Sequence, residues 1–264
     1  MKMLVIPDVH LKPWMFEDAD RIMQTKVADN VICLGDIPDD FKCKNNAGLY
    51  NETFDKAEEF LEKYPKSLWI IGNHEASYLW NKWQSGKAYH AEKTAEIRIN
   101  HLYRRIREIN SDNLAYVFHI GKVVFSHAGI TESFIKMLIQ KYPYITKDMS
   151  GIDKMTEFFN SLYQNDLWND YSFLWARPQG LIPKYEQMWR TPDADIQVTG
   201  HTPMKEITVE GKINDIKSGI LISCDVFSTD RDRKPYGNEE YLLIDTATGE
   251  WRGIKPPKGF TEII

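Results

Sequence analysis

The chain has 264 residues, a length that fits one large domain and can bury a sizeable core. Its hydrophobic fraction of 42% and charged fraction of 27% are ordinary for a globular protein. The net charge of −5 excludes an overall basic field, so no stable nucleic-acid partner is expected. No stretch approaches the about 18 apolar residues of a membrane span, so no membrane partner is expected either.

The cysteines indicate a reducing compartment. Cys33, Cys43 and Cys224 form no CxxC pair, and a sparse, odd set argues against a secreted disulfide scaffold. The N-terminus runs into the predicted strand 3–6 without an apolar signal segment. We therefore expect a cytoplasmic protein.

Short apolar runs alternate with helical spacings over the first 71 residues. Strands are predicted at 3–6, 31–34 and 68–71, with helices over 16–26 and 51–64 between them. This strand–helix rhythm predicts parallel strands joined by crossover helices. In such sheets ligands collect beyond the carboxyl ends of the strands.

The rest of the chain predicts further helices and a second set of strands. A hairpin is expected from strands 115–118 and 122–125 around a turn at 119–121. The other elements expected are a mostly helical stretch over 75–109, helices over 131–142 and 153–164, and strands near 195–199, 205–209, 219–223, 240–245 and 250–254.

These elements predict an α/β fold with a two-sheet β-sandwich core flanked by helices. The sequence shows no repeat, low-complexity tract or linker, so one domain over 1–264 is the simplest organisation. The regions near 76–113 and 150–192 are expected to be helical elaborations beside the site.

Polar side chains follow three of the predicted strands at the point where each strand ends. Asp8 and His10 follow the first, Asp36 follows the second, and Asn73 and His74 follow the third. Residues two apart in an extended segment share a face, so the first pair can reach one ion. Each motif alone has a structural explanation, because aspartate caps helices and Gly-Asp forms turns.

Two later histidines, His127 and His201, also follow apolar strands. A single histidine in such a place commonly packs at the rim of a core. Together with the earlier side chains, however, the set combines carboxylates, an amide oxygen and imidazoles, which suit Mn, Fe or Zn. It is too rich for one ion and fits two ions that share a carboxylate, an arrangement that attacks phosphate esters.

The ordered motifs DxH, GD, GNHE, SHAG and GHTP resemble those of the calcineurin-like metallophosphoesterase superfamily over roughly residues 3–225. The branch that holds phosphoprotein phosphatases and symmetrical diadenosine tetraphosphatases is similar in two further places. Asp39 matches the second aspartate of its GDxxD motif. Arg177, within Leu-Trp-Ala-Arg-Pro, matches a phosphate-binding arginine of bacterial and phage members.

The resemblance implies a role for each of these residues. The implied ligands are Asp8, His10 and Asp36 for one ion, and Asp36, Asn73, His127 and His201 for the other. A metal-bound hydroxide would attack phosphorus in line, and His74 would protonate the leaving group. Asp39 would orient His74, and Arg177 would bind phosphoryl oxygens. Two divalent ions are implied, with Mn expected and Fe, Zn, Co or Ni as alternatives.

The sequence also departs from the branch pattern. Pro203 stands where many phosphodiesterases of the superfamily carry a second metal-binding histidine, which favours the phosphatase-like branch. Asp40 and Ile71 stand where that branch usually has arginines that grip phosphate. Arg177 remains. The other arginines that could compensate are Arg98, Arg104, Arg105, Arg231 and Arg233.

The predicted function is hydrolysis of a phosphomonoester, with Ser/Thr phosphoproteins as the expected substrates. The alternatives are a hydrolase for dinucleoside polyphosphates such as diadenosine tetraphosphate, a phosphodiesterase, and a non-catalytic scaffold. Aromatic residues such as Trp80, Trp83 and Trp175 could stack on a nucleobase, although packing is the commoner use of tryptophan. The expected partner is therefore a phosphorylated protein or a nucleotide.

Overall fold

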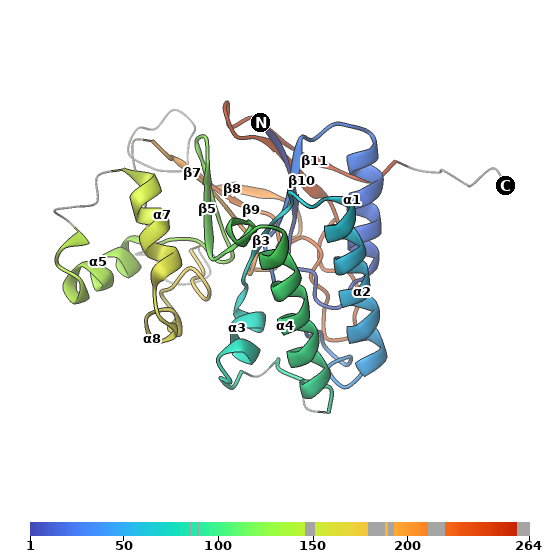
Figure 1. The fold of residues 1–264 in the computed structure, drawn as a ribbon. Helices are drawn as coiled ribbons and strands as arrows, with labels where there is room; N and C mark the ends of the chain where they lie inside the picture. Colours follow the sequence, from blue (N-terminus) through green and yellow to red (C-terminus); the bar gives the residue numbers. More distant parts are fainter. Residues whose placement is uncertain are drawn as a thin grey trace.

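Two β-sheets lie face to face in this computed structural model, with helices on both outer sides (Figure 1). The structure describes residues 1–84, 86–88, 90–145, 151–178, 188–189, 193–210 and 220–257. The predicted α/β sandwich flanked by helices is thereby confirmed. The single-domain organisation stays a prediction.

The six-stranded sheet has the order β11-β10-β1-β2-β3-β4. Its strands are β1 (Lys2–Ile6), β2 (Asn30–Cys33), β3 (Leu68–Ile70), β4 (Leu114–Ala115), β10 (Tyr241–Asp245) and β11 (Trp251–Ile254). The strands β1 to β4 are parallel neighbours, and β10 and β11 add an antiparallel edge. Strands β1 and β2 read as continuous apolar runs because helices cover one face and the second sheet covers the other.

The five-stranded sheet has the order β5-β6-β7-β9-β8. Its strands are β5 (Val117–Ile120), β6 (Val123–Ser126), β7 (Ile196–Thr199), β8 (Thr208–Glu210) and β9 (Ile220–Ser223). The predicted hairpin exists, but its turn lies two residues later than expected. His119 belongs to β5 and not to the turn, because it pairs with Val124 of β6, and its ring bonds to Asp153 and to the Gly121 carbonyl. Residue 115, expected in the first strand of this hairpin, instead belongs to β4, which pairs with β3 of the other sheet.

Helices α1 (Trp14–Gln24), α2 (Ala47–Lys63) and α4 (Glu92–Ile109) form the layer outside the six-stranded sheet, on the right of Figure 1. Each presents an apolar stripe at helical spacing to the core. Phe16 of α1, for example, stacks on Trp69 of β3 with ring centroids 5.9 Å apart. Within the predicted elaboration 76–113, α4 thus packs beside α2 as part of this layer.

The remaining helices are α3 (Asn73–Leu79), the 3₁₀ turn η1 (Ser111–Asn113), α5 (Glu132–Lys141), α7 (Ile152–Ser161) and α8 (Gln164–Leu167). Of these, α5, α7 and α8 lie on the side of the five-stranded sheet and α3 lies at the end of β3 (Figure 1), while η1 joins α4 to β4. In the predicted elaboration 150–192, residues 150, 179–187 and 190–192 lie outside the described residues.

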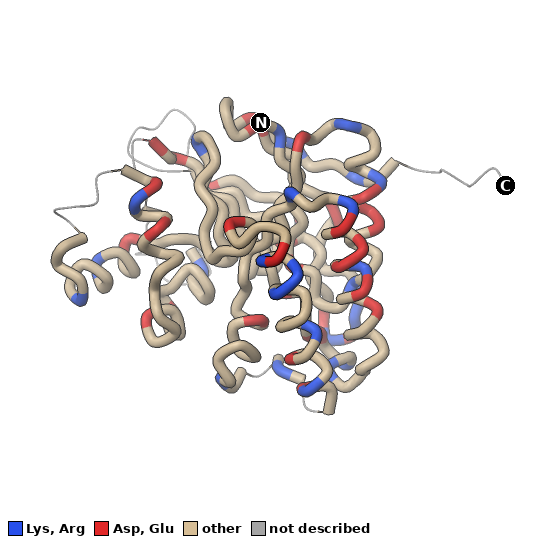
Figure 2. The backbone as a smooth tube through the Cα atoms, in the orientation of Figure 1, with Lys and Arg blue, Asp and Glu red and all other residues tan. Residues whose placement is uncertain are grey.

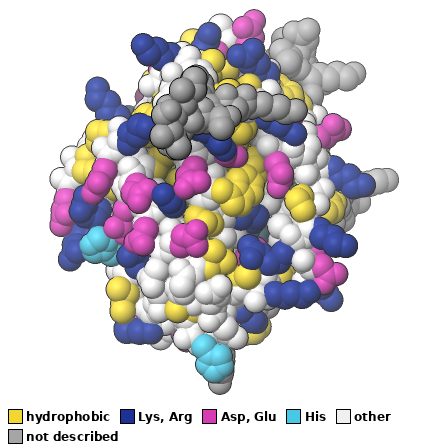
Figure 3. Space-filling model, turned by 90° about the vertical axis from the view of Figure 1, so that its right-hand side faces the viewer, with side chains coloured by type: hydrophobic (Ala, Val, Ile, Leu, Met, Phe, Trp, Pro, Cys, Tyr) yellow, Lys and Arg dark blue, Asp and Glu magenta, His cyan; other side chains and the backbone are white. Residues whose placement is uncertain are grey.

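The outer helical layer carries charges of both signs. Figure 2 shows acidic and basic residues interleaved along these helices, and Figure 3 shows them mixed over the face that the layer presents. Ion pairs such as Lys63 with Asp20 and Arg105 with Glu62 join neighbouring helices there. The described residues of this face therefore form a surface of mixed charge. Among the described residues, no helix has the length and apolar character needed to cross a bilayer.

Gly35 should be indispensable where β2 turns towards the site. Its φ is +94°, and an added Cβ would lie 2.6 Å from the Gly72 nitrogen and 2.8 Å from the Ile70 oxygen. We expect Gly35→Ala to lower the free energy of unfolding by about 2–4 kcal/mol, measured by urea denaturation.

The matched control is Gly48→Ala. Gly48 is exposed in α2, and an added Cβ would meet only the Asn46 side chain, at 3.3 Å. This variant should stay within about 1 kcal/mol of the wild type. Equal losses from both substitutions would show that the backbone at Gly35 is not constrained.

Candidate functional site

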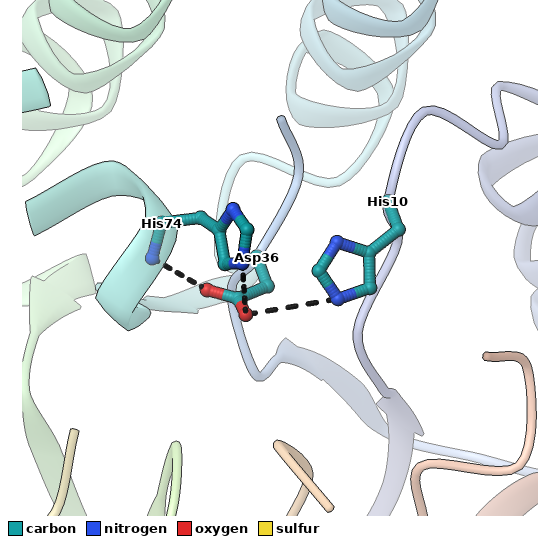
Figure 4. Close-up of side chains that lie close together, drawn as sticks. All are labelled: His10, Asp36 and His74. Carbon is teal, nitrogen blue, oxygen red and sulfur yellow. Dashed lines mark hydrogen bonds and ion pairs between the residues drawn. The ribbon is translucent and has the colours of Figure 1, made fainter. Parts of the chain in front are cut away.

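The Asp36 carboxylate lies at the centre of the site. In Figure 4 dashed lines join it to the rings of both His10 and His74, which follow the ends of β1 and β3. Asp36 Oδ2 is 3.7 Å from His10 Nε2, 3.9 Å from His74 Nε2 and 3.3 Å from His127 Nε2. The other oxygen, Oδ1, accepts a hydrogen bond of 2.9 Å from the His74 backbone nitrogen. One buried carboxylate thus joins residues from both sheets.

The second group of side chains surrounds His127, at the end of β6. Its Nε2 lies 2.8 Å from Asn73 Oδ1 and 3.1 Å from His201 Nδ1. Asp36, His127 and His201 are all buried, and their ligand atoms lie within 4.8 Å of one another. The same limit holds for His10, Asp36 and His74. Two clusters that could hold a cation therefore share Asp36.

Hydrogen bonds outside the clusters fix the histidine tautomers. His10 Nδ1 lies 2.8 Å from the Asp39 backbone oxygen, and His127 Nδ1 lies 2.9 Å from the Leu34 backbone oxygen. A carbonyl can only accept, so each Nδ1 carries the proton. The Nε2 lone pairs of both rings are left to face Asp36, as in metal-binding histidines.

The donor set fits a metal ion. With Nδ1 protonated, a neutral His127 would turn its Nε2 lone pair towards oxygen and nitrogen acceptors of Asp36, Asn73 and His201, so this position needs either a proton on Nε2 or a cation. A cation among them removes this conflict. In addition, His201 Nε2 is buried with no hydrogen-bond partner among the described residues. Oxygen and imidazole ligands of this kind suit first-row divalent ions.

Asp8 is held beside these clusters by backbone contacts. Its two oxygens accept from the His201 backbone nitrogen at 3.0 and 2.9 Å, and its Oδ2 lies 4.0 Å from His10 Nε2. This approach needs glycine at position 200, because an added Cβ there would lie 1.9 Å from Asp8 Oδ1. The contact joins the end of β1 to the end of β7 across the two sheets.

Charge is distributed unevenly in this buried group. Burial opposes ionisation of Asp36, but His127 and His74 hold the pKa of Asp36 well below its usual range. Burial likewise opposes protonation of His127, but Asp36 and Asp8 raise the pKa of His127 to about 10. Burial and His127 lower the pKa of His201 well below its usual range. Positive charge is therefore favoured at the position between Asp36 and His127.

His74 is held by a second carboxylate. Its Nδ1 lies 2.7 Å from Asp39 Oδ2, while Asp39 Oδ1 accepts from Tyr50 at 2.5 Å and Tyr78 at 2.6 Å. Burial opposes protonation of His74, but Asp36 and Asp39 raise the pKa of His74 to about 9. The imidazole is thus oriented with Nδ1 away from Asp36 and Nε2 towards it.

Glu75 fixes the backbone on which Asp36 stands. Its Oε2 accepts from the Asp36 and Gly72 nitrogens, each at 3.0 Å, and its Oε1 accepts from the Ile37 nitrogen at 2.6 Å. The carboxylate is fully buried. It ties the end of β2 to the start of α3.

Several site residues have strained backbone conformations. His10, Asp36, Asp39 and His201 all have φ between +45° and +67°. Non-glycine residues adopt this left-handed region rarely and at a cost of about 1–3 kcal/mol each. Such strain tends to concentrate where function demands a particular side-chain direction.

An open cavity of about 440 Å³ lies over both clusters. Its lining includes His10, Asp36, Asn73, His74, Trp175, Arg177 and His201. A larger cavity of about 750 Å³, lined by Lys2, Lys122 and Asp195 among others, is a separate hollow. The ligand clusters found among the described residues belong to the smaller cavity, which is therefore the candidate site.

Arg177 lines this cavity and is anchored beside it. Its Nη1 donates to the His201 backbone oxygen and to Thr202 Oγ1, both at 3.2 Å. The arginines suggested as compensating groups lie elsewhere or are paired. Three of them make ion pairs on the outer helices: Arg98 with Asp55 and Glu58, Arg104 with Glu108, and Arg105 with Glu62. Arg233 pairs with Asp40, and neither it nor Arg231 lines the cavity.

The structure brings all nine sequence-predicted site residues to one region and adds others that the sequence did not indicate. Tyr50 and Tyr78 have helical spacing, which the core explains equally well, so nothing marked them as donors to Asp39. Gln84 lies in a polar loop without periodicity, yet its Oε1 accepts from Asn73 Nδ2 at 3.2 Å. Asp225 follows β9 and also lines the cavity. Its place at a strand end was the available signal.

The tryptophans divide between packing and the cavity. Trp80 meets Trp168 edge-on at 6.0 Å, and Trp168 meets Trp175 edge-on at 5.1 Å. Trp175 alone of these lines the cavity, where its ring lies 6.1 Å from that of His201. Trp83 is 81% exposed and lies outside the cavity lining.

Fold and site together define a metal-dependent hydrolase: a two-sheet α/β sandwich with paired clusters of metal-ligating side chains at its strand ends. A family model described as calcineurin-like phosphoesterase matches residues 1–205. The chain belongs to the calcineurin-like phosphoesterase family and is a metal-dependent phosphoesterase. The expectation of the superfamily is thus confirmed.

Solved structures with similar folds have low sequence identity to this chain. One is a cold-active protein-tyrosine phosphatase of a psychrophilic Shewanella species, with 16% identity, 96% of this chain and 80% of that chain covered, and a TM-score of 0.47. Another is an archaeal phosphodiesterase, with 13% identity, coverage of 97% and 99%, and a TM-score of 0.40. A metallophosphoesterase from Sphaerobacter thermophilus has 13% identity, coverage of 97% and 88%, and a TM-score of 0.43. A search of curated proteins finds no match.

Proposed function

We propose that this phosphoesterase hydrolyses phosphomonoesters and that its substrates are Ser/Thr phosphoproteins. The observation that carries the proposal is the position of His74, which Asp39 holds beside the shared Asp36 carboxylate at the wall of an open cavity. An acid in that place can protonate the oxygen that leaves from phosphorus. Pro203 also lines the cavity, at the position where many phosphodiesterases of the superfamily have a second metal-binding histidine. Its presence favours a phosphatase over a diesterase.

We assign the metal ligands as the resemblance implies. Asp8, His10 and Asp36 would hold one divalent ion, and Asp36, Asn73, His127 and His201 would hold the other. When bound, the two ions would activate water as the nucleophile and neutralise charge on the phosphoryl group. Mn is the proposed metal, with Fe, Zn, Co and Ni as alternatives, because all of these suit imidazole and carboxylate ligands.

The chain's own residues would complete the chemistry. Arg177 would bind a phosphoryl oxygen through the guanidinium nitrogens that its backbone anchor leaves available. His74 would donate its Nε2 proton to the leaving group, and Asp39 would keep that ring charged and oriented. Tyr50 and Tyr78 would in turn hold the Asp39 carboxylate in place.

One observation favours the second candidate, a dinucleoside polyphosphate hydrolase. The rim of the cavity includes Phe41, which is 55% exposed, together with Trp175, Lys42 and Lys44. Aromatic and basic side chains at one rim could hold a nucleobase and additional phosphates. For location we propose the cytoplasm, since the three cysteines are free thiols.

A substrate panel with Mn tests the proposal. We expect p-nitrophenyl phosphate and a phosphothreonine peptide to give higher kcat/KM than bis(p-nitrophenyl) phosphate or diadenosine tetraphosphate. Turnover confined to the dinucleotide would establish the second candidate. A protein that binds two ions but turns over none of the four would instead be a scaffold.

Asp36→Asn should weaken both ions at once. A neutral amide attracts cations less than a carboxylate and bridges two of them poorly. After dialysis against Mn we expect two ions in the wild type and fewer than one in the variant, measured by mass spectrometry of the metal content. The control is Asp153→Asn, at a carboxylate whose side chain is 84% exposed. Two retained ions in Asp36→Asn would rule out the bridging role.

His74→Ala should lower kcat without loss of metal. General acids contribute about 10²–10⁴-fold, and the contribution grows as the leaving group becomes poorer. We therefore expect about a 100-fold or larger decrease for phenyl phosphate and a much smaller one for 2,4-dinitrophenyl phosphate. His101→Ala, on α4, is the control. Equal decreases for the two esters would exclude His74 as the proton donor.

A further inference from the structure

A buried hydrogen-bond donor at the cavity wall has no place in the chemistry described so far. Gln84 lies between α3 and α4, is 8% exposed and lines the cavity beside Asn73 and His74. Its Nε2 is buried and has no hydrogen-bond partner within the part of the chain that the structure describes. Buried amide donors are nearly always paired, so this one calls for an acceptor beyond the described residues, and a ligand in the cavity that Gln84 lines is one such acceptor.

The direction of the amide follows from Asn73. Asn73 Oδ1 faces His127 Nε2 at 2.8 Å, on the side where the proposed ion would lie, so Asn73 Nδ2 points away from it. That Nδ2 donates to Gln84 Oε1 at 3.2 Å. The oxygen of Gln84 is therefore committed to Asn73. The hydrogen-bond network thus assigns the two ends of the Gln84 amide: the oxygen accepts from Asn73, and the nitrogen is the donor without a partner among the described residues.

We propose that Gln84 Nε2 donates a hydrogen bond to a phosphoryl oxygen of the bound phosphate ester. The proposal rests on the proposed function and adds a substrate-binding residue to it. Two arginines expected from the branch pattern are absent, since Asp40 and Ile71 occupy their places. The lysines and arginines among the described lining residues are Arg177, Lys42 and Lys44, and Lys42 is paired with Asp232. The uncharged Gln84 amide next to Asn73 supplies one of the phosphate contacts that the two absent arginines would otherwise make.

The competing explanation is that Gln84 only orients Asn73. Two substitutions separate the explanations. Gln84→Glu keeps an oxygen that can accept from Asn73 Nδ2 but replaces the donor by a carboxylate oxygen. Gln84→Met keeps the length of the side chain and removes both polar atoms.

Inorganic phosphate is the probe, titrated by calorimetry into protein loaded with Mn. We expect both variants to retain two Mn ions. Gln84→Met should weaken phosphate binding about 5-fold, the loss of one hydrogen bond, and Gln84→Glu about 10-fold or more, since a carboxylate repels phosphate. The kcat/KM for p-nitrophenyl phosphate should fall in the same order. Gln140→Glu adds the same charge on the exposed side of α5 and should change neither quantity.

The other outcomes overturn the proposal in distinguishable ways. Unchanged phosphate affinity in Gln84→Glu, with metal lost only from Gln84→Met, would reduce Gln84 to a positioning residue for Asn73. Metal loss from both variants would have the same meaning. Wild-type protein that holds two Mn ions but binds no phosphate would overturn the proposed function, and the role of Gln84 with it. Circular dichroism of each variant verifies that it is folded.

Discussion

The rest of the structure depends on one buried anion, the carboxylate of Asp36. A carboxylate withdrawn from water is unfavourable unless charges and donors surround it. Here the surrounding groups come from several strand ends: His10 after β1, His74 after β3 and His127 after β6. Both sheets must therefore meet at this edge for the charge to be balanced. The same buried charge therefore constrains both the packing of the two sheets and the chemistry at their edge.

The backbone around the carboxylate shows what this constraint costs. Asp36 and His201 adopt left-handed φ values, and Gly35 accepts a close approach that no other residue could make. Glu75 offsets part of the cost with three backbone hydrogen bonds that hold both sides of the turn. A loop with fewer contacts would relax away from such a geometry. The buried, strand-anchored ends do not, so the side chains remain aimed at one another.

Polar groups at the site fall into two kinds. Some are fully engaged inside the protein, such as Asp39 with its tyrosines and His74, or Asp8 with the His201 nitrogen. Others, such as His201 Nε2 and Gln84 Nε2, are buried without a partner among the described residues. The engaged groups hold the backbone and the side chains around the unpartnered groups in place. This contrast fits a site built around cations and an oxygen-rich ligand, as expected of a metal-dependent phosphoesterase.

The sequence by itself determined the sandwich, the parallel core strands and the polar residues at the strand ends. These features depend on the spacing of apolar residues and on turn residues, which are local properties of the chain. The sequence predicted the start of the hairpin turn two residues too early, since His119 and Ile120 extend β5 by pairing with β6, a register that local spacing does not encode. Only the tertiary structure decided which histidine nitrogen faces Asp36 and that, of the arginines considered, Arg177 alone lines the cavity. It also decided that Tyr50, Tyr78 and Gln84 belong to the site. These contacts join residues far apart in the chain or in loops without periodicity, so they exist only once the two sheets are packed.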